Sequence, residues 1–126
     1  GAREALDRLQ PVLSAGEVLD LQAQVGRIHA SEEILDYIMA IIFATRKHSE
    51  VALGVSTRGA LTYYKACQAF AMTHGRDYVV PDDVKKLGGP VLAHRVVLRS
   101  RQMLRGDFAP EEAFIDRIIA NIPVPR

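Results

Sequence analysis

The sequence predicts a mainly α-helical bundle of four to five helices, with at most a small β element near Val96 to Leu98. Three observations indicate this. A serine or a proline stands before each long apolar pattern, where helices prefer to begin. The apolar residues recur at the three- and four-residue spacing of a helix face, and the stretch HRVVLR carries β-branched residues that could form a short strand. A chain of 126 residues that is 48% hydrophobic and 25% charged has the composition of a single domain with one core.

The first two helices are predicted from their start signals. Ser14 and Glu17 have the Ser-x-x-Glu spacing of a capping box, and the helix should run to about Gln24. Ser31 caps the second helix, which has acidic residues in its first turn and basic residues in its last, as the helix dipole favours. Its buried stripe is expected to contain Ile34, Leu35, Ile38, Ile41, Ile42 and Thr45.

The third helix is predicted from Ser56 to Gly75, because glycine commonly follows the end of a helix. Its inward face should carry Leu61, Tyr64, Cys67, Phe70 and Ala71. Pro81 opens a fourth helix with acid in its first turn, and the sequence GGP is expected to break or kink it near Leu87.

A last helix begins at Pro110, with Glu111 and Glu112 in its first turn. It follows the short strand HRVVLR and the polar loop SRQMLRGD. Its inward residues are expected to be Phe114, Ile115, Ile118 and Ile119. For the bundle as a whole, the core should include Ile38, Ile42, Leu61, Tyr64, Phe70 and Val84.

The residue inventory argues against several function classes. The net charge of +1 lacks the positive excess of a dedicated nucleic-acid binder. Cys67 is the single cysteine, so one chain cannot form a disulfide or a thiolate metal site, and its apolar helical setting favours an inert buried thiol. No metal-ligand spacing is found among the dispersed histidines His29, His48, His74 and His94. Without a phosphate loop or a nucleophile elbow, the chain by itself is not expected to be an enzyme.

Two further expectations concern location and charge. No stretch approaches about 20 apolar residues and no signal peptide is visible, which favours the cytoplasm. A basic run extends from Arg95 through Arg99 and Arg101 to Arg105, and it could meet a phosphate or an acidic partner. Because the run is short and lacks aromatic stacking partners, a solvated loop is the simpler interpretation.

The stretch GVSTRGAL places a charge where a helix does not favour it. Ser56 caps the helix, and Arg58 puts a cation in the first turn, which costs about 0.3–1 kcal/mol. Arg58 could pair on the surface with an acid such as Glu50 or Asp83. Alternatively, its partner is an anion outside this domain, since a guanidinium fork beside free backbone N–H groups suits a phosphate.

The motifs LGVSTRGAL, ACQAFAMTHGRDYVVPDDVKKL and VLAHRVVL resemble, in their order and spacing, the C-terminal helical lid of AAA+ ATPases, in particular the MoxR family. The segments EEILDYIMAIIFATRKH and IPVPR extend the resemblance over most of the chain from about Pro11. It implies that residues 1–126 form a single C-terminal lid-type domain, with residues 1–13 as a lead-in from an absent ATPase core and 14–126 as the helical lid. Two positions depart from the family pattern. Thr57 stands where proline is common, and Val80 replaces a threonine cap, which should weaken that helix start.

The same resemblance implies a role for each matching residue. Arg58 falls on the arginine of the family's Gly-x-Ser-x-Arg-x-x-Leu sensor-2 motif, which contacts the γ-phosphate of ATP, while Ser56 and Thr57 would lie near the nucleotide. ATP and Mg²⁺ would be held mainly by the absent core, so the lid alone should be inactive. The full-length protein is expected to form a ring, typically a hexamer. It would couple nucleotide state to chaperone-like remodelling of clients such as von Willebrand factor A domains or metal-dependent enzymes.

A second resemblance gives the alternative function. The stretch AFAMTHGRDYVVPDDV is similar to the later half of a histone fold, which would imply a helical protein- or DNA-interaction module with no nucleotide role. A charge of +1 offers little phosphate neutralisation, so DNA binding would be weak. A purely structural interaction module, with Arg58 merely paired on the surface, is the third possibility. Neither a membrane nor a nucleic acid is the expected partner.

Overall fold

The computed structural model describes residues 13–100 and 107–126. The helices within these ranges are α2 (Ala15–Gly26), α3 (Glu32–Lys47), α4 (Thr57–Thr73), α5 (Pro81–Leu92), the 3₁₀ helix η1 (Ala93–Arg95) and α6 (Ala109–Ala120). Two short strands, β1 (Val51–Leu53) and β2 (Val97–Leu98), complete the described elements. The prediction of a mainly helical bundle with a small β element near Val96 to Leu98 is confirmed.

Serine side chains begin three of these helices, as the sequence predicted. The Ser14 hydroxyl accepts the Glu17 N–H at 3.1 Å, and the Glu17 carboxylate accepts the Ser14 N–H at 3.2 Å. Ser31 caps α3 and Ser56 caps α4 in the same way, each through its hydroxyl and the N–H three residues on. These bonds satisfy backbone donors that a helix start would otherwise leave without partners.

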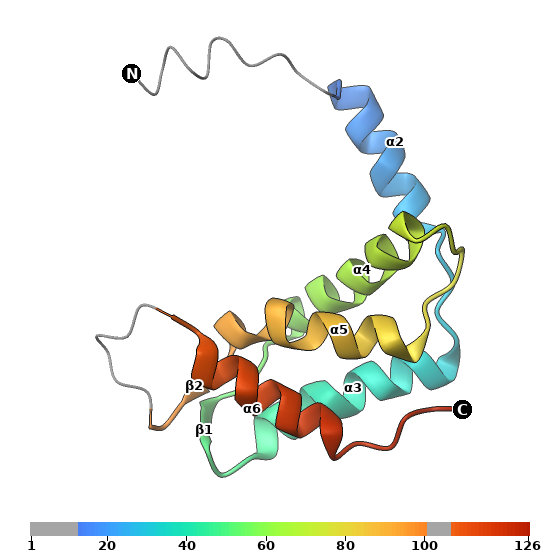
Figure 1. Cartoon of the computed structure of the whole chain (residues 1–126). Helices are drawn as coiled ribbons and strands as arrows, with labels where there is room; N and C mark the ends of the chain where they lie inside the picture. Colours follow the sequence, from blue (N-terminus) through green and yellow to red (C-terminus); the bar gives the residue numbers. More distant parts are fainter. Residues whose placement is uncertain (1–12, 101–106) are drawn as a thin grey trace, which may run out of the picture.

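Helices α3 to α6 pack around one core, and α2 extends from the end of the bundle where α4 finishes (Figure 1). Helix α5 contacts both α4 and α6, and α3 contacts the same two helices. Helix α2 buries none of its residues. The strands β1 and β2 pair antiparallel, Val51 opposite Leu98 and Leu53 opposite Val97, with an irregular register between the two pairs. This small sheet leads directly into the start of α4.

The expected break of α5 near Leu87 is wrong, because the helix continues through GGP to Leu92. Pro90 sits inside the helix, where it cannot donate a hydrogen bond to the carbonyl one turn back. Gly88 and Gly89 are buried in the contact with α6. A Cβ on Gly88 would lie only 2.3 Å from Cδ1 of Ile119. The glycines therefore permit a close helix–helix approach and do not mark a helix end.

The predicted inward faces of α3, α4 and α6 are correct in most positions. All four apolar residues expected inside from α6 are buried, and Ile38, Ile42 and Val84 are core residues as expected. In α4 the buried residues are Gly59, Ala60, Tyr63, Cys67, Gln68 and Ala71. Leu61 is 51% exposed, Leu35 of α3 is 40% exposed, and Tyr64 and Phe70 are only half-buried, so these core assignments are wrong or partly wrong.

One hydrogen bond explains why the face of α4 is rotated from the predicted one. The hydroxyl of the fully buried Tyr63 donates to the Val84 carbonyl of α5, which directs Tyr63 to the interior in place of Tyr64. Leu35, Leu61 and Tyr64 instead line one open groove of about 310 Å³ between α3 and α4. Three of the four misplaced residues of the two helices thus belong to a single apolar surface, and Phe70 is not part of it.

The connection between α4 and α5 is held by an ion pair. Gly75 adopts a positive φ of 73°, and the Arg76 guanidinium then donates two hydrogen bonds of 2.6 Å to the Asp83 carboxylate. The same carboxylate accepts the Val80 N–H at 2.9 Å, so Asp83 supplies the cap that the Val80 side chain lacks. Burial by itself would raise the pKa of Asp83, but the Arg76 hydrogen bonds and the Val80 N–H outweigh it and hold the pKa below its ordinary value.

Two further titratable side chains, those of Glu111 and Cys67, are buried in the bundle. Glu111 was expected to be an ordinary first-turn acid of the last helix, but it is fully buried. The Cys67 thiol is also buried, and burial, followed by the nearby Asp83 charge, raises its pKa to about 12. No helix of residues 13–100 and 107–126 is long and apolar enough to cross a bilayer.

Candidate functional site

The loop between β1 and α4 is fastened to the last turn of α3 through a single residue, Val55. Its N–H donates to the Thr45 hydroxyl at 3.1 Å, and its carbonyl accepts a hydrogen bond of 2.8 Å from Nε of Arg46. The Thr45 hydroxyl in turn donates to the Ile42 carbonyl at 2.6 Å. We call Thr45, Arg46 and their two bonds to Val55 the Thr45–Arg46 clamp. Both polar groups of the Val55 backbone are satisfied by α3, so the start of α4 has a defined position.

Gly54 allows the clamp to form. A Cβ at this position would lie 2.7 Å from Cα and 2.9 Å from the backbone nitrogen of Arg46. Those are backbone atoms of α3, which cannot move aside as the end of a side chain can. The first glycine of GVSTRGAL is therefore required by the close approach of this loop to α3.

The three residues that the sequence singled out follow directly. The Ser56 hydroxyl accepts the Gly59 N–H at 3.1 Å as the N-cap, and Thr57 is the exposed first residue of α4. Arg58 is exposed, and within residues 13–100 and 107–126 its guanidinium has no hydrogen bond or ion pair. The structure thus places all three together at the N-terminal end of α4.

The surface partners considered for Arg58 are engaged elsewhere. Asp83 binds Arg76 beyond the opposite end of α4. Glu50 lies 3.3 Å from Arg117 and 3.8 Å from His48. The alternative that Arg58 is a surface arginine paired with Glu50 or Asp83 is therefore not what the structure shows.

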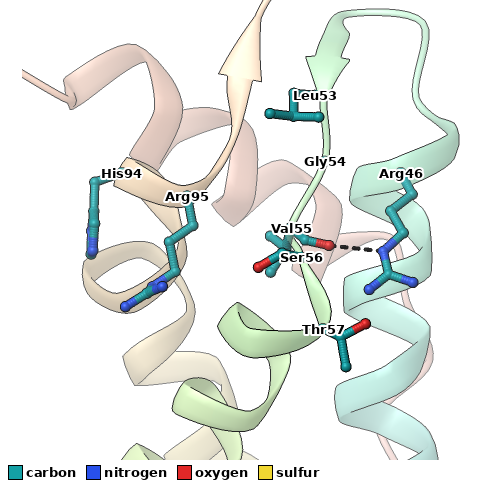
Figure 2. A pocket seen from close by; sticks show the side chains of 8 residues that line it. All are labelled: Arg46, Leu53, Gly54, Val55, Ser56, Thr57, His94 and Arg95. Atoms are coloured by element: carbon teal, nitrogen blue, oxygen red, sulfur yellow. Dashed lines mark hydrogen bonds between the residues drawn. The ribbon is translucent and has the colours of Figure 1, made fainter.

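An open groove of about 610 Å³ lies beside this helix start (Figure 2). Its lining residues are Arg46, Leu53, Gly54, Val55, Ser56, Thr57, His94 and Arg95. Arg58, the next residue of α4 after Thr57, is not among them. The lining includes two arginines, one histidine and no carboxylate. In Figure 2 Arg46 lies to one side of the Val55–Thr57 segment, and His94 and Arg95 extend side by side on the other. A groove with these groups, beside the positive end of a helix dipole, is suited to an anion.

Sequence reasoning missed Arg46, and it considered Arg95 only as part of a basic run for which a solvated loop was the simpler interpretation. Arg46 was interpreted only as a charge that suits the end of α3, because its partner Val55 is brought near by folding and no local pattern reveals it. Arg95 was grouped with a solvated basic run, which the structure does not keep together. Arg95 lines the groove, the Arg99 side chain donates to the Ser49 carbonyl at 3.2 Å, and Arg101 and Arg105 lie outside the described residues. The sequence signals for Arg95 were its place in the motif VLAHRVVL and in a basic run that could meet a phosphate.

The donor groups at the groove favour an anion. In the described part of the chain, no three histidine, cysteine, aspartate or glutamate side chains converge to hold a metal ion. The groove is lined by the guanidinium groups of Arg46 and Arg95 and by the hydroxyls of Ser56 and Thr57, which can donate hydrogen bonds to the oxygen atoms of a phosphate or carboxylate.

Comparison with known proteins agrees with this architecture. The family model described as AAA lid domain matches residues 43–118, which contain the clamp, α4, α5 and most of α6. The uncharacterised protein YeaC of Bacillus subtilis is 38% identical over 120 residues, covering 95% of this chain and 37% of its own length. The chaperone MoxR1 of Mycobacterium tuberculosis is 33% identical over 124 residues, covering 91% of this chain and 32% of that protein.

A solved structure gives the same result in three dimensions. A candidate ATPase from Cytophaga hutchinsonii superposes with a TM-score of 0.77 at 27% identity, covering 93% of this chain and 38% of that one. The chain therefore spans only about a third of the length of these relatives. Since the matching family model covers more than half of its residues, the chain belongs to the AAA lid domain family, as a lid of the MoxR type.

Proposed function

We propose that this domain is the lid of a MoxR-type AAA+ ATPase in which Arg58 acts as the sensor-2 residue, contacting the γ-phosphate of ATP bound to the core of the longer protein. One observation carries the proposal. Arg58 is an exposed arginine in the first turn of α4, and no described residue is its hydrogen-bond or ion-pair partner. A cation that works against the helix dipole and lacks an internal counter-ion is explained if its partner is an anion from outside the domain.

The chemistry of phosphoryl transfer fits this position. Negative charge spreads over the oxygens of the transferring group, and a guanidinium placed there stabilises it. The bound nucleotide and its Mg²⁺ supply the reactive phosphoryl group and shield its charge. The residues of this lid contribute binding and positioning: Ser56 fixes the helix start, Thr57 lies in the groove wall, and Arg58 extends from the first turn.

The same contact would connect nucleotide state to movement of the lid. The Thr45–Arg46 clamp binds Val55, directly before α4, to helix α3. A force on the Arg58 guanidinium would therefore be transmitted through α4 to the rest of the bundle. Hydrolysis would release that contact and allow the lid to change its angle to the core. We further propose that a ring of such subunits, typically a hexamer, uses this motion for chaperone-like remodelling of client proteins. The name of the relative from Mycobacterium tuberculosis supports that part of the proposal.

The test is to replace Arg58 in the full-length protein. Arg58→Ala should lower kcat for ATP at least about 100-fold, roughly 3 kcal/mol of transition-state stabilisation. Arg58→Lys should restore only part of the rate, because an ammonium cannot form the two parallel bonds of a guanidinium. Lys65→Ala removes another exposed cation from α4 and serves as the matched control, which should retain the parental rate. If Arg58→Ala hydrolyses ATP as fast as the parent, Arg58 is not a sensor.

A further inference from the structure

Arg95 has an environment that its role in the fold does not explain. Its Nε is buried from solvent and has no hydrogen-bond partner in the part of the chain that the structure describes. A buried donor without a partner is costly, so native proteins rarely retain one without a use for it. The residue lies in η1, next to His94, and lines the same groove as Ser56 and Thr57.

The first turn of α4 is shaped to receive this arginine. Gly59 has no side chain, and a Cβ placed there would lie 3.3 Å from Cδ of Arg95 and 2.7 Å from Cγ1 of Val55. The aliphatic part of Arg95 therefore crosses the helix surface at the residue that follows Arg58. Arg95 of η1 therefore packs beside the first turn of α4, the turn that carries Arg58. Arg46 of the clamp lies on the other side of the groove from Arg95 (Figure 2).

Among the described residues, no acidic side chain forms an ion pair with these arginines. The ion pairs within residues 13–100 and 107–126 join Asp83 to Arg76 and Glu50 to Arg117 and His48, and none of them includes Arg46, Arg58 or Arg95. None of the described residues that line the groove has a carboxylate either. Like charges collected without counter-ions repel one another, and a bound polyanion would remove that repulsion.

We propose that Arg95 is a second phosphate-contacting residue of the lid, so that the phosphate chain of the nucleotide is held by guanidinium groups from both η1 and α4. This inference rests on the proposed nucleotide role of Arg58 but assigns a different task. Arg58 stabilises charge on the group being transferred, whereas Arg95 contributes binding of the phosphate chain. Loss of Arg95 should therefore weaken nucleotide affinity more than it lowers turnover at saturating ATP.

The experiment uses the full-length protein and measures the Kd of the slowly hydrolysed analogue ATPγS by competition with a fluorescent nucleotide. Arg95→Met keeps the length of the aliphatic stem over Gly59 and removes the charge, and it should raise the Kd at least about tenfold. The Kd of Arg95→Lys should fall between that of Arg95→Met and that of the parent. The matched control is Arg27→Met, which removes an exposed arginine far from the groove and should leave the Kd unchanged.

A thermal readout separates phosphate binding from an ion pair between lid and core. If Arg95 contacts phosphate, Arg95→Met should have a Tm no lower than that of the parent in the absence of nucleotide and show a smaller rise in Tm when ATPγS is added. A lower Tm without nucleotide, together with an unchanged rise, would identify an interdomain ion pair and overturn the proposal. So would a Kd for Arg95→Met, or for Arg95→Lys if the first variant does not fold, within roughly twofold of the parent.

The two proposals fail in distinguishable ways. If Arg58→Ala abolishes turnover while Arg95→Met binds ATPγS normally, the sensor assignment stands and the inference about Arg95 is wrong. If Arg95→Met weakens binding while Arg58→Ala turns over ATP normally, Arg95 remains a phosphate contact and the sensor assignment is wrong.

Discussion

The arginines at the two ends of α4 differ in whether the described part of the domain provides a counter-ion. Beyond the C-terminal end, Arg76 donates two 2.6 Å hydrogen bonds to Asp83, a carboxylate that is itself buried. At the N-terminal end, Arg58 is exposed and has no partner among the described residues. Where an arginine holds the fold together, the chain provides its counter-ion. At the other end no described residue provides one, and we propose that the partner of Arg58 is an anion outside the domain.

The largest expected effect on stability is at the paired end. Asp83→Asn removes the negative charge from a buried site that binds Arg76 and caps α5, and it should lower the free energy of unfolding by about 2–3 kcal/mol. Urea unfolding of the 126-residue chain measures this loss. If Asp83→Asn were as stable as the parent, the Arg76–Asp83 ion pair would not stabilise the fold, and the contrast between the two ends of α4 would be wrong.

Acid should erase the same contribution. The pKa of Asp83 is lowered in the folded state, so its stabilisation is complete above the ordinary carboxyl pKa of about 3.9 and is lost as the pH falls from there through the lower folded value. The stability difference between the parent and Asp83→Asn should therefore be constant near neutral pH and shrink below about pH 4. A difference that instead grows in acid would show that the ion pair is not its source.

A smaller effect is expected at the clamp that positions the other end. Gly54→Ala forces a Cβ against the backbone of Arg46 and should cost about 1–3 kcal/mol, the usual range for overpacking. Gly16→Ala is a suitable control, because the nearest atom to its Cβ is 3.9 Å away and alanine favours the helix. If both substitutions have equal effects on urea unfolding, the loop is not held against α3 as described.

The smallest expected effect belongs to Arg58 itself. Because it is exposed and pairs with no described residue, Arg58→Ala should change the free energy of unfolding by less than about 0.5 kcal/mol. Urea unfolding of this variant beside Asp83→Asn compares the two ends of α4 directly. A loss comparable with that of Asp83→Asn would mean that Arg58 has a structural role, and the contrast between the ends would no longer support a functional one.

Local features of the sequence predicted the helices well, and contacts between distant segments account for the errors. Ser14, Ser31 and Ser56 start their helices as expected because a cap and its partner are only three residues apart. The continuation of α5 through GGP could not be inferred, since Gly88 is explained by Ile119 on another helix.

The candidate site shows the same division. Arg58 could be identified because its charge conflicts with the dipole of its own helix, and that conflict is visible in the sequence alone. Arg46 was not identified and Arg95 was not separated from its basic run, because their contacts with Val55 and Gly59 bring together segments that are distant along the chain. The exposed position of Leu61 was also beyond reach, since it depends on the bond between Tyr63 and Val84.

The Thr45–Arg46 clamp has an entropic consequence for any ligand that reaches this surface. Fixing one loop residue costs about 1–2 kcal/mol of conformational entropy, and here that cost for residues 54–56 is met when the domain folds. The Arg58 side chain, in contrast, remains free to rotate, so a contact with it gives up only about 2 kcal/mol of rotamer entropy. An anion that binds here therefore orders only the Arg58 side chain and not the backbone of residues 54–56. Less of the interaction free energy is then lost to conformational entropy.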